Sequence, residues 1–218
     1  MRATMVGAGL LVCAAAAWVG TAPAAGEGSR AALAGANDGG QMEIGAALEL
    51  RANGRFQYQL SYGALDEMAT GRWTPRGDGI VLDSDPVTAP AFELVGGTPG
   101  AADGFDVALE VPEGMDAQYF EAAVIFGGNS GRSEQLEATS HHFALKPGEV
   151  VSQVALALSV FEIVSPRFTV PPGTHAMRFR FHANDLGHVA FTHQALKRDG
   201  NAFVLERFGR TLRFRKRR

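Results

Sequence analysis

The sequence predicts an all-β fold, in which a small N-terminal antiparallel meander packs on a larger β-sandwich-like region. Apolar and polar residues alternate with a period of two in several short segments, as they do in strands with one buried face. Turn sequences rich in Gly, Pro and Asp separate these segments at a spacing of roughly ten residues. The pair Asn53-Gly54 lies between two alternating runs and predicts a tight hairpin, because both central positions of a type I′ turn need a positive φ.

The first 24 residues have the pattern of a secretory signal peptide. Arg2 precedes an apolar stretch from residue 5 to residue 19, and Ala22-Pro23-Ala24 fits the small-residue cleavage pattern. A membrane anchor is the alternative, but the stretch is shorter than the about 20 residues that span a bilayer. We therefore expect a mature chain that starts near Ala25, has no transmembrane segment and is periplasmic or secreted in a Gram-negative bacterium.

Residues 25–40 are small, polar and without periodicity, so we expect a flexible leader there. Cys13 is the single cysteine of the chain and lies inside the predicted signal peptide. A disulfide framework is therefore excluded for the mature chain, although an exported protein would permit one. Stability must come from an apolar core.

Residues 41–95 form the predicted N-terminal β-meander. After the Asn-Gly turn, Phe56, Tyr58 and Leu60 share one face of a strand because side chains alternate across it. A second hairpin turns at residues 75–79. Prolines 86 and 90 end its last strand, because proline has no N–H for the ladder, and residues 91–95 are predicted to add one more strand.

Residues 96–103 are predicted as a linker because Gly and Pro dominate them. Residues 104–218 are predicted as a β-sandwich-like domain with a basic C-terminal strand. Residues 151–160 are apolar enough for a helix, but their many valines and their brevity favour a strand. The strands predicted before the C-terminal hairpin lie at residues 105–111, 122–126, 142–145, 150–160 and 167–170.

The adjacent residues Asp66 and Glu67 raise the question of a catalytic pair. Neighbouring side chains diverge on a strand and on a helix, so they do not face each other at the about 5 to 9 Å that acid and base pairs need. We expect them to form the bend between two strands, bracketed by Gly63 and Gly71. If the meander encloses a cavity, the residues predicted to bind a ligand are the aromatic Tyr58, Tyr62 and Trp73; the alternative is that they belong to the core.

A metal site is an alternative reading of the histidines. The spacing of His182, His188 and His193 matches no zinc signature, so we expect structural histidines, no metal and no cofactor. If these three histidines meet across neighbouring strands, they would form a metal site and, together with Asp185, a metal-assisted enzyme.

Charge is distributed unevenly along the chain. Residues 25–124 carry 16 acidic and 5 basic side chains, a net charge of −11, and residues 125–218 carry 7 acidic and 14 basic, a net charge of +7. We expect the two halves to attract each other. The basic C-terminus is also predicted to bind an anionic envelope polymer or lipopolysaccharide, and no nucleic acid is expected because the chain is exported. The residues predicted for this contact are Arg213, Arg215, Lys216, Arg217 and Arg218.

Two stretches resemble known families. The segment LELRANGRFQY at residues 48–58, followed by GRW at 71–73 and GIVL at 79–82, resembles the opening meander of lipocalin-like small barrels, including the N-terminal domain of copper-resistance outer-membrane lipoproteins. This chain lacks the Cys pair and the lipid anchor of those lipoproteins, so the resemblance does not imply copper handling. The stretch YGALDE at 62–67 resembles uncharacterised exported proteins of Gram-negative bacteria and implies no function.

These patterns together predict an exported, non-catalytic β protein that binds a ligand or an envelope partner. No motif assembles a nucleophile, a base and a stabilising group. Ser130 lies in the Gly-rich turn GGNSG, which lacks the G-x-S-x-G order of a nucleophile elbow.

Overall fold

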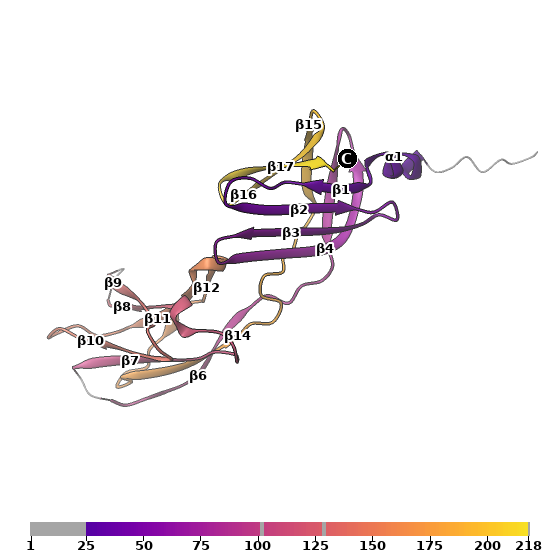
Figure 1. The fold of residues 1–218 in the computed structure, drawn as a ribbon. Helices are drawn as coiled ribbons and strands as arrows, with labels where there is room; N and C mark the ends of the chain where they lie inside the picture. The colour runs from indigo at the N-terminus through magenta and orange to yellow at the C-terminus, as the bar shows by residue number, and fades with distance from the viewer. Residues whose placement is uncertain (1–24, 101–102, 128–129, 218) are drawn as a thin grey trace, which may run out of the picture.

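The computed structural model describes residues 25–100, 103–127 and 130–217 and confirms the all-β class. A closed eight-stranded barrel forms one end of the molecule, and a sandwich of two sheets forms the other (Figure 1). The predicted signal peptide lies outside the described residues.

The barrel is closed by strands from both ends of the chain. In Figure 1 the indigo strands of the N-terminus lie beside the yellow strands of the C-terminus. In the order of their hydrogen bonding, the strands are β1 (Gly35–Asp38), β17 (Arg210–Lys216), β16 (Ala202–Arg207), β15 (Gln194–Asp199), β5 (Gly79–Ser84), β4 (Leu65–Arg76), β3 (Arg55–Tyr62) and β2 (Ile44–Leu50). β1 closes the ring because it pairs with β2 on one side and with β17 on the other.

The sandwich is built from the middle of the chain. One sheet has the order β10 (Ser140–Ala144), β7 (Gly104–Glu110), β14 (Ala176–His182) and β6 (Ala91–Thr98). The other has the order β12 (Ile163–Val164), β11 (Gln153–Leu158), β8 (Glu121–Ile125) and β9 (Gly131–Gln135), with β13 (Phe168–Thr169) paired to β11. Two 3₁₀ helices, η1 (Ala117–Tyr119) and η2 (Ser159–Phe161), follow β7 and β11.

The division of the chain differs from the predicted one. β6 lies in the sandwich although residues 91–95 were assigned to the meander, and residues 96–98 of the predicted linker continue this strand. β15, β16 and β17 lie in the barrel although residues 104–218 were assigned to one sandwich-like domain. The physical reason is that a period-two pattern shows which side chains face inward but not which distant strand supplies the hydrogen bonds.

The predicted flexible leader is also different in the structure. Residues 25–40 contain the helix α1 (Ala25–Leu33) and the strand β1. The Asn37 side chain is 3% exposed, and its amide donates hydrogen bonds to the carbonyl oxygens of Gly35 and Leu48. The segment is ordered by its long-range pairing with β2 and β17, which its small, polar composition does not reveal.

Each body has its own apolar core. The barrel core is packed with aromatic and aliphatic side chains, the largest being Trp73, Tyr58 and Phe214, which are at most 1% exposed. The sandwich core includes the fully buried Phe105, Phe120 and Phe179. Phe161 of η2 packs against both cores and so provides an apolar contact between the two bodies.

The chain crosses between barrel and sandwich at residues 85–90 and 183–193, so the sandwich is an insertion between β5 and β15. The two crossing segments are hydrogen-bonded to each other. The Thr88 N–H donates to the Asp185 carboxylate at 2.7 Å, and the Asp185 N–H donates to the Thr88 carbonyl at 3.1 Å. The second segment also pairs with Met68 of β4 through the Gly187 carbonyl and the Val189 N–H, both at 2.8 Å.

Asp85 fixes the start of the first crossing segment. Arg55 donates to the Asp85 carboxylate with both terminal nitrogens, one of them at 2.8 Å, and the Thr70 hydroxyl donates at 2.9 Å. The hydrogen bonds from Arg55 and then Thr70 lower the pKa of Asp85 to about 2, so the side chain is a carboxylate at neutral pH.

Gly71 generates a prediction about barrel packing. A Cβ atom at this position would lie 2.1 Å from the carbonyl oxygen of Asp83 and 2.7 Å from a ring carbon of Phe56. The backbone of β5 would have to move, so we expect Gly71→Ala to lower the free energy of unfolding by about 2 kcal/mol or more. Urea denaturation followed by circular dichroism measures this change.

Gly45→Ala in β2 is the matched control, because an added Cβ would lie 3.9 Å from that of Ser61 at an exposed position. Its free energy of unfolding should change by less than about 0.5 kcal/mol. Equal losses in the two variants would contradict the close approach of β4 and β5.

Candidate functional site

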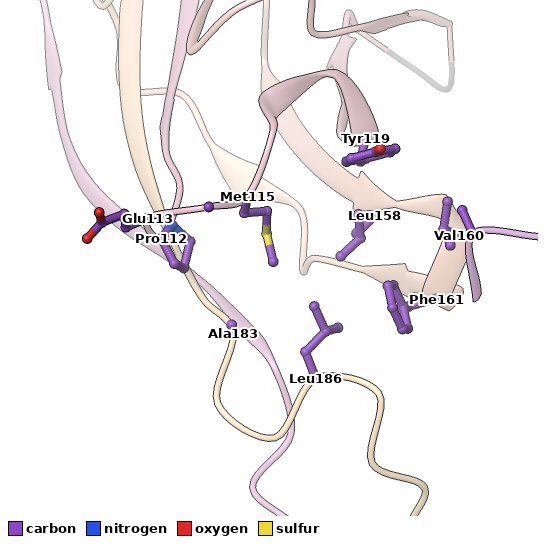
Figure 2. Close-up of a pocket in the computed structure, with 11 residues that line it drawn as sticks. Pro112, Glu113, Met115, Tyr119, Leu158, Val160, Phe161, Ala183 and Leu186 are labelled. Atoms are coloured by element: carbon purple, nitrogen blue, oxygen red, sulfur yellow. The ribbon is translucent and has the colours of Figure 1, made fainter. Parts of the chain in front are cut away.

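An apolar groove of about 610 Å³ lies where the barrel meets the sandwich (Figure 2). Its walls come from segments that are far apart in the sequence. The side chains that form it are Ala64, Pro112, Met115, Tyr119, Leu158, Val160, Phe161, Ala183 and Leu186, together with Glu113 at the edge. A concave apolar site at a domain junction, with a volume between about 300 and 1,000 Å³, is typical of small-molecule sites.

The connection from β7 to β8 supplies one wall of the groove. Asp116 caps η1 by accepting a hydrogen bond from the Gln118 N–H at 3.0 Å. This cap fixes the short helix that presents Tyr119, whose side chain is 49% exposed. Met115 precedes the cap and points into the groove in Figure 2.

The end of β11 supplies the opposite wall. Leu158 is buried, and η2 then turns Val160 and Phe161 toward the barrel. Glu162 ends η2 in the left-handed conformation at φ 56°, which redirects the chain into β12. In Figure 2, Leu158 and Phe161 point toward Leu186 of the second crossing segment, whereas the carboxylate of Glu113 is directed away from the apolar side chains.

A second, smaller pocket of about 310 Å³ lies at the mouth of the barrel and shares Phe161 and Leu186 with the groove. Its polar side chains are Glu67, Asp185, His188 and Arg207. Glu67 is 7% exposed and lies on β4, and Arg207 lies on β16. The Arg207 guanidinium donates to both Glu67 oxygens, at 3.1 Å and 2.5 Å, so a two-point ion pair joins strands that are not neighbours in the barrel.

Tyr58 lies close to this ion pair, inside the barrel. Its side chain is fully buried, and its hydroxyl has no hydrogen-bond partner among the described residues. Burial, and then the negative charge of Glu67, raise the pKa of Tyr58 well above its usual range. The Tyr58 phenol is therefore neutral at physiological pH and is a core residue of the barrel.

Asp66 and Glu67 do not form a bend. Both lie within β4, and the turn that precedes it is at Gly63 and Ala64. As the strand geometry requires, the two side chains face opposite ways, with Asp66 exposed and Glu67 buried. The Gly residues favoured a turn here, but the hairpin pairing of β4 with β3, in which Asp66 lies opposite Ser61 and Glu67 opposite Leu60, continues the strand through both residues.

The predicted aromatic ligand contacts belong to the barrel core or pack against it. Trp73 is 1% exposed in the barrel core, and its indole N–H donates to the Arg51 carbonyl at 3.0 Å. Tyr62 is half-buried at the end of β3, where Arg210 stacks on its ring at 5.0 Å and donates to its hydroxyl. The structure places neither Tyr62 nor Trp73 in the groove.

The three histidines of the alternative metal site do not meet. His182 contacts Glu93 at 2.7 Å on the outer face of the sandwich, and His193 contacts Asp83 at 2.9 Å on the barrel. His188 lies at the junction, in the small pocket. Within residues 25–100, 103–127 and 130–217, no three His, Cys, Asp or Glu side chains are arranged to hold a metal ion.

The basic C-terminus forms the last strand of the barrel. Leu212 and Phe214 point into the core, and Arg213 and Arg215 are exposed. The outward side chains are partly paired: Arg213 contacts Asp199, and Arg217 contacts Asp38 at 3.4 Å, while Lys216 donates to the Ala32 carbonyl at 3.5 Å. Arg218 lies outside the described residues.

Comparisons of the chain with protein-family models, with curated proteins and with solved structures found no match. In the described part of the chain, no helix has the length and apolar character needed to cross a membrane. A function for this chain therefore has to be inferred from the geometry of the groove and of the small pocket.

Sequence patterns did not indicate the groove. Its main side chains come from the β3–β4 turn, the β7–β8 connection, η2 and the second crossing segment, which lie far apart in the sequence. One local signal was present: Val160 and Phe161 continue an apolar run beyond the end of β11.

The Glu67–Arg207 pair generates a prediction about stability. Arg207→Met leaves a buried carboxylate without its partner, so we expect the free energy of unfolding to fall by about 3 kcal/mol. Glu67→Gln combined with Arg207→Met removes both charges and should recover at least about 1 kcal/mol of this loss. Urea denaturation of the two variants measures the difference.

Arg210→Met is the control, because Arg210 is exposed on the neighbouring strand. Its stability should change by less than about 1 kcal/mol. A double variant less stable than the Arg207→Met single variant would refute the coupling of Glu67 and Arg207.

Proposed function

We propose that this chain is an exported, non-catalytic binding protein and that the groove between barrel and sandwich holds the apolar part of a small ligand. The observation that carries the proposal is the groove itself, an open apolar hollow of about 610 Å³ at the junction of two packed bodies. Apolar surface that stays exposed in a folded protein commonly marks a binding site. Export is supported by the signal-peptide pattern of the first 24 residues.

The side chains of the groove suit binding rather than reaction. Apart from Glu113 and Tyr119, all of the side chains that line it are apolar. A groove with apolar walls and few polar groups binds a ligand mainly because apolar surface is removed from water. Each Å² of buried apolar surface contributes about 25 cal/mol to the binding free energy. A catalytic site would need a nucleophile or a proton-transfer group within reach of the ligand.

Dye binding tests the proposal. We expect the mature protein to bind N-phenyl-1-naphthylamine, a neutral apolar dye whose fluorescence rises out of water. Val160→Lys places an ammonium group on the groove wall and should raise the Kd at least about fivefold, equivalent to about 1 kcal/mol of lost apolar contact. Fluorescence titration measures the Kd.

Val164→Lys is the matched control, because Val164 is 71% exposed on β12 and lies outside the groove. It should leave the Kd unchanged. Tyr119→Ser provides a second groove variant at a position that is already 49% exposed, in case Val160→Lys disturbs the junction. Absence of dye binding, or equal Kd values in groove and control variants, would exclude the groove as the site.

A second candidate function is retention on an anionic envelope polymer or lipopolysaccharide through the outer face of β17. Arg215 favours it: its side chain is exposed and makes no ion pair with any described residue. Lys197 of β15 faces the same side as Arg213, because both pair with Val204 of β16. Positive side chains on one face attract polyanions.

Chromatography on dextran sulfate tests this second candidate. Arg215→Gln combined with Arg217→Gln should elute at lower salt than the wild type, because two positive charges of the face are lost. Arg72→Gln combined with Arg76→Gln, at exposed positions of β4, changes the net charge equally and should elute close to the wild type. Equal shifts for the two double variants would show that net charge alone decides retention. Deletion of the strand is unsuitable, because Phe214 is fully buried in the barrel core.

A further inference from the structure

We propose that the ligand of the groove is a cationic amphiphile, whose apolar chain lies between the groove walls and whose positive head lies beside the carboxylates of the junction. This inference rests on the proposed function and adds the chemical class of the ligand. It is supported by charge complementarity between a positive ligand head and the carboxylates of the junction.

The junction is surrounded by more negative than positive side chains. Glu113 lies at the edge of the groove, and Glu162 directly follows Phe161 of its wall. Glu67 and Asp185 line the small pocket that shares Phe161 and Leu186 with the groove. The positive side chains near these four carboxylates are Arg207 and the imidazole of His188 in the small pocket, and Arg210, which stacks on Tyr62.

The guanidinium that lines the small pocket is not free for an anionic ligand. Arg207 uses its Nε and one terminal nitrogen to hold both oxygens of Glu67. Burial within the barrel mouth makes this pair a fixed neutral unit. The remaining carboxylates, Glu113, Asp185 and Glu162, therefore leave an excess of negative charge around the junction.

Glu113 is the carboxylate best placed to meet a ligand head. It is exposed and makes no hydrogen bond or ion pair with any described residue. Two other carboxylates of the sandwich are paired, because Glu93 contacts His182 and Glu110 contacts Arg180. Figure 2 shows the Glu113 carboxylate at the edge of the groove, directed away from the apolar side chains, where a charged head can stay in water.

The apolar walls and the charged edge together fit one kind of molecule. A chain inserted among Met115, Leu158 and Leu186 leaves its head near the groove edge, beside Glu113. A positive head is attracted there, and a carboxylate or phosphate head is repelled. A carboxylate about 5 Å away through water changes the affinity for a unit charge about fourfold.

Two amphiphiles with comparable chains and opposite heads test the inference. Decyltrimethylammonium and decanoate, below their micelle concentrations, compete with N-phenyl-1-naphthylamine for the wild-type protein at pH 7.5. At about 10 mM ionic strength we expect the cation to bind at least about fourfold more tightly than the anion. At about 1 M salt the preference should fall below about twofold.

Glu113→Gln should reduce the preference at low salt at least about twofold while leaving the Kd of the neutral dye unchanged. Asp78→Asn is the control, because Asp78 is an exposed carboxylate in the turn between β4 and β5, away from the groove. It should keep the full preference.

The outcomes separate the two proposals. If the wild-type protein fails to bind the dye, both the groove and the ligand class are excluded. If the dye binds but decanoate competes as well as decyltrimethylammonium or better, the proposed function survives and the cationic ligand is excluded. A preference for the cation that Glu113→Gln leaves intact also overturns the inference, because the charge at the groove edge would then play no part.

Discussion

The hydrogen-bonded closure of the barrel is the constraint on which the rest of the structure depends. β1 is only four residues long, yet it completes the ring by pairing with β2 and with β17. Closure gives every strand of this body a partner on both sides, although β1 and β17 share only two residue pairs. It also requires the last strands of the chain to return to the first ones, so everything between β5 and β15 must leave the barrel and come back. The sandwich is formed by this intervening part of the chain.

The junction between the two bodies follows directly from the insertion of the sandwich between β5 and β15. The departing and returning segments lie side by side and are joined by hydrogen bonds between Thr88 and Asp185. Leu186 of the returning segment lines the groove together with Phe161 of η2, which packs against both cores. Two convex bodies joined in this way leave an unfilled space beside the contact, and the groove occupies that space. The paired charges of Glu67 and Arg207 lie at the same end of the barrel, above the buried ring of Tyr58.

The strands themselves could be predicted from the sequence, because alternation is a local property of side chains. Phe56, Tyr58 and Leu60 face inward as their period of two requires. A hairpin turn forms at Asn53-Gly54, but of these two residues only Gly54, at φ 80°, has a positive φ, so the turn is not of the predicted type I′. The neighbours of each strand could not be predicted, because hydrogen bonds between distant segments leave no local pattern; this is why β15 to β17 were assigned to the wrong body. The same limit applies to the site. Met115, Phe161 and Leu186 are ordinary apolar residues in the sequence, and their shared position depends on the path of the whole chain.

The insertion also sets an order in which the protein can acquire its structure. All strands of the sandwich lie within residues 91–182, so that body can form from one continuous stretch as soon as it has emerged. The barrel cannot close before residues 194–216 have been synthesised, because these residues form β15, β16 and β17. During that interval the first strands have exposed edges and apolar faces, a state in which β proteins are prone to associate with one another. The early sandwich then brings the two parts of the barrel together, because the segments that lead into it and out of it are hydrogen-bonded to each other.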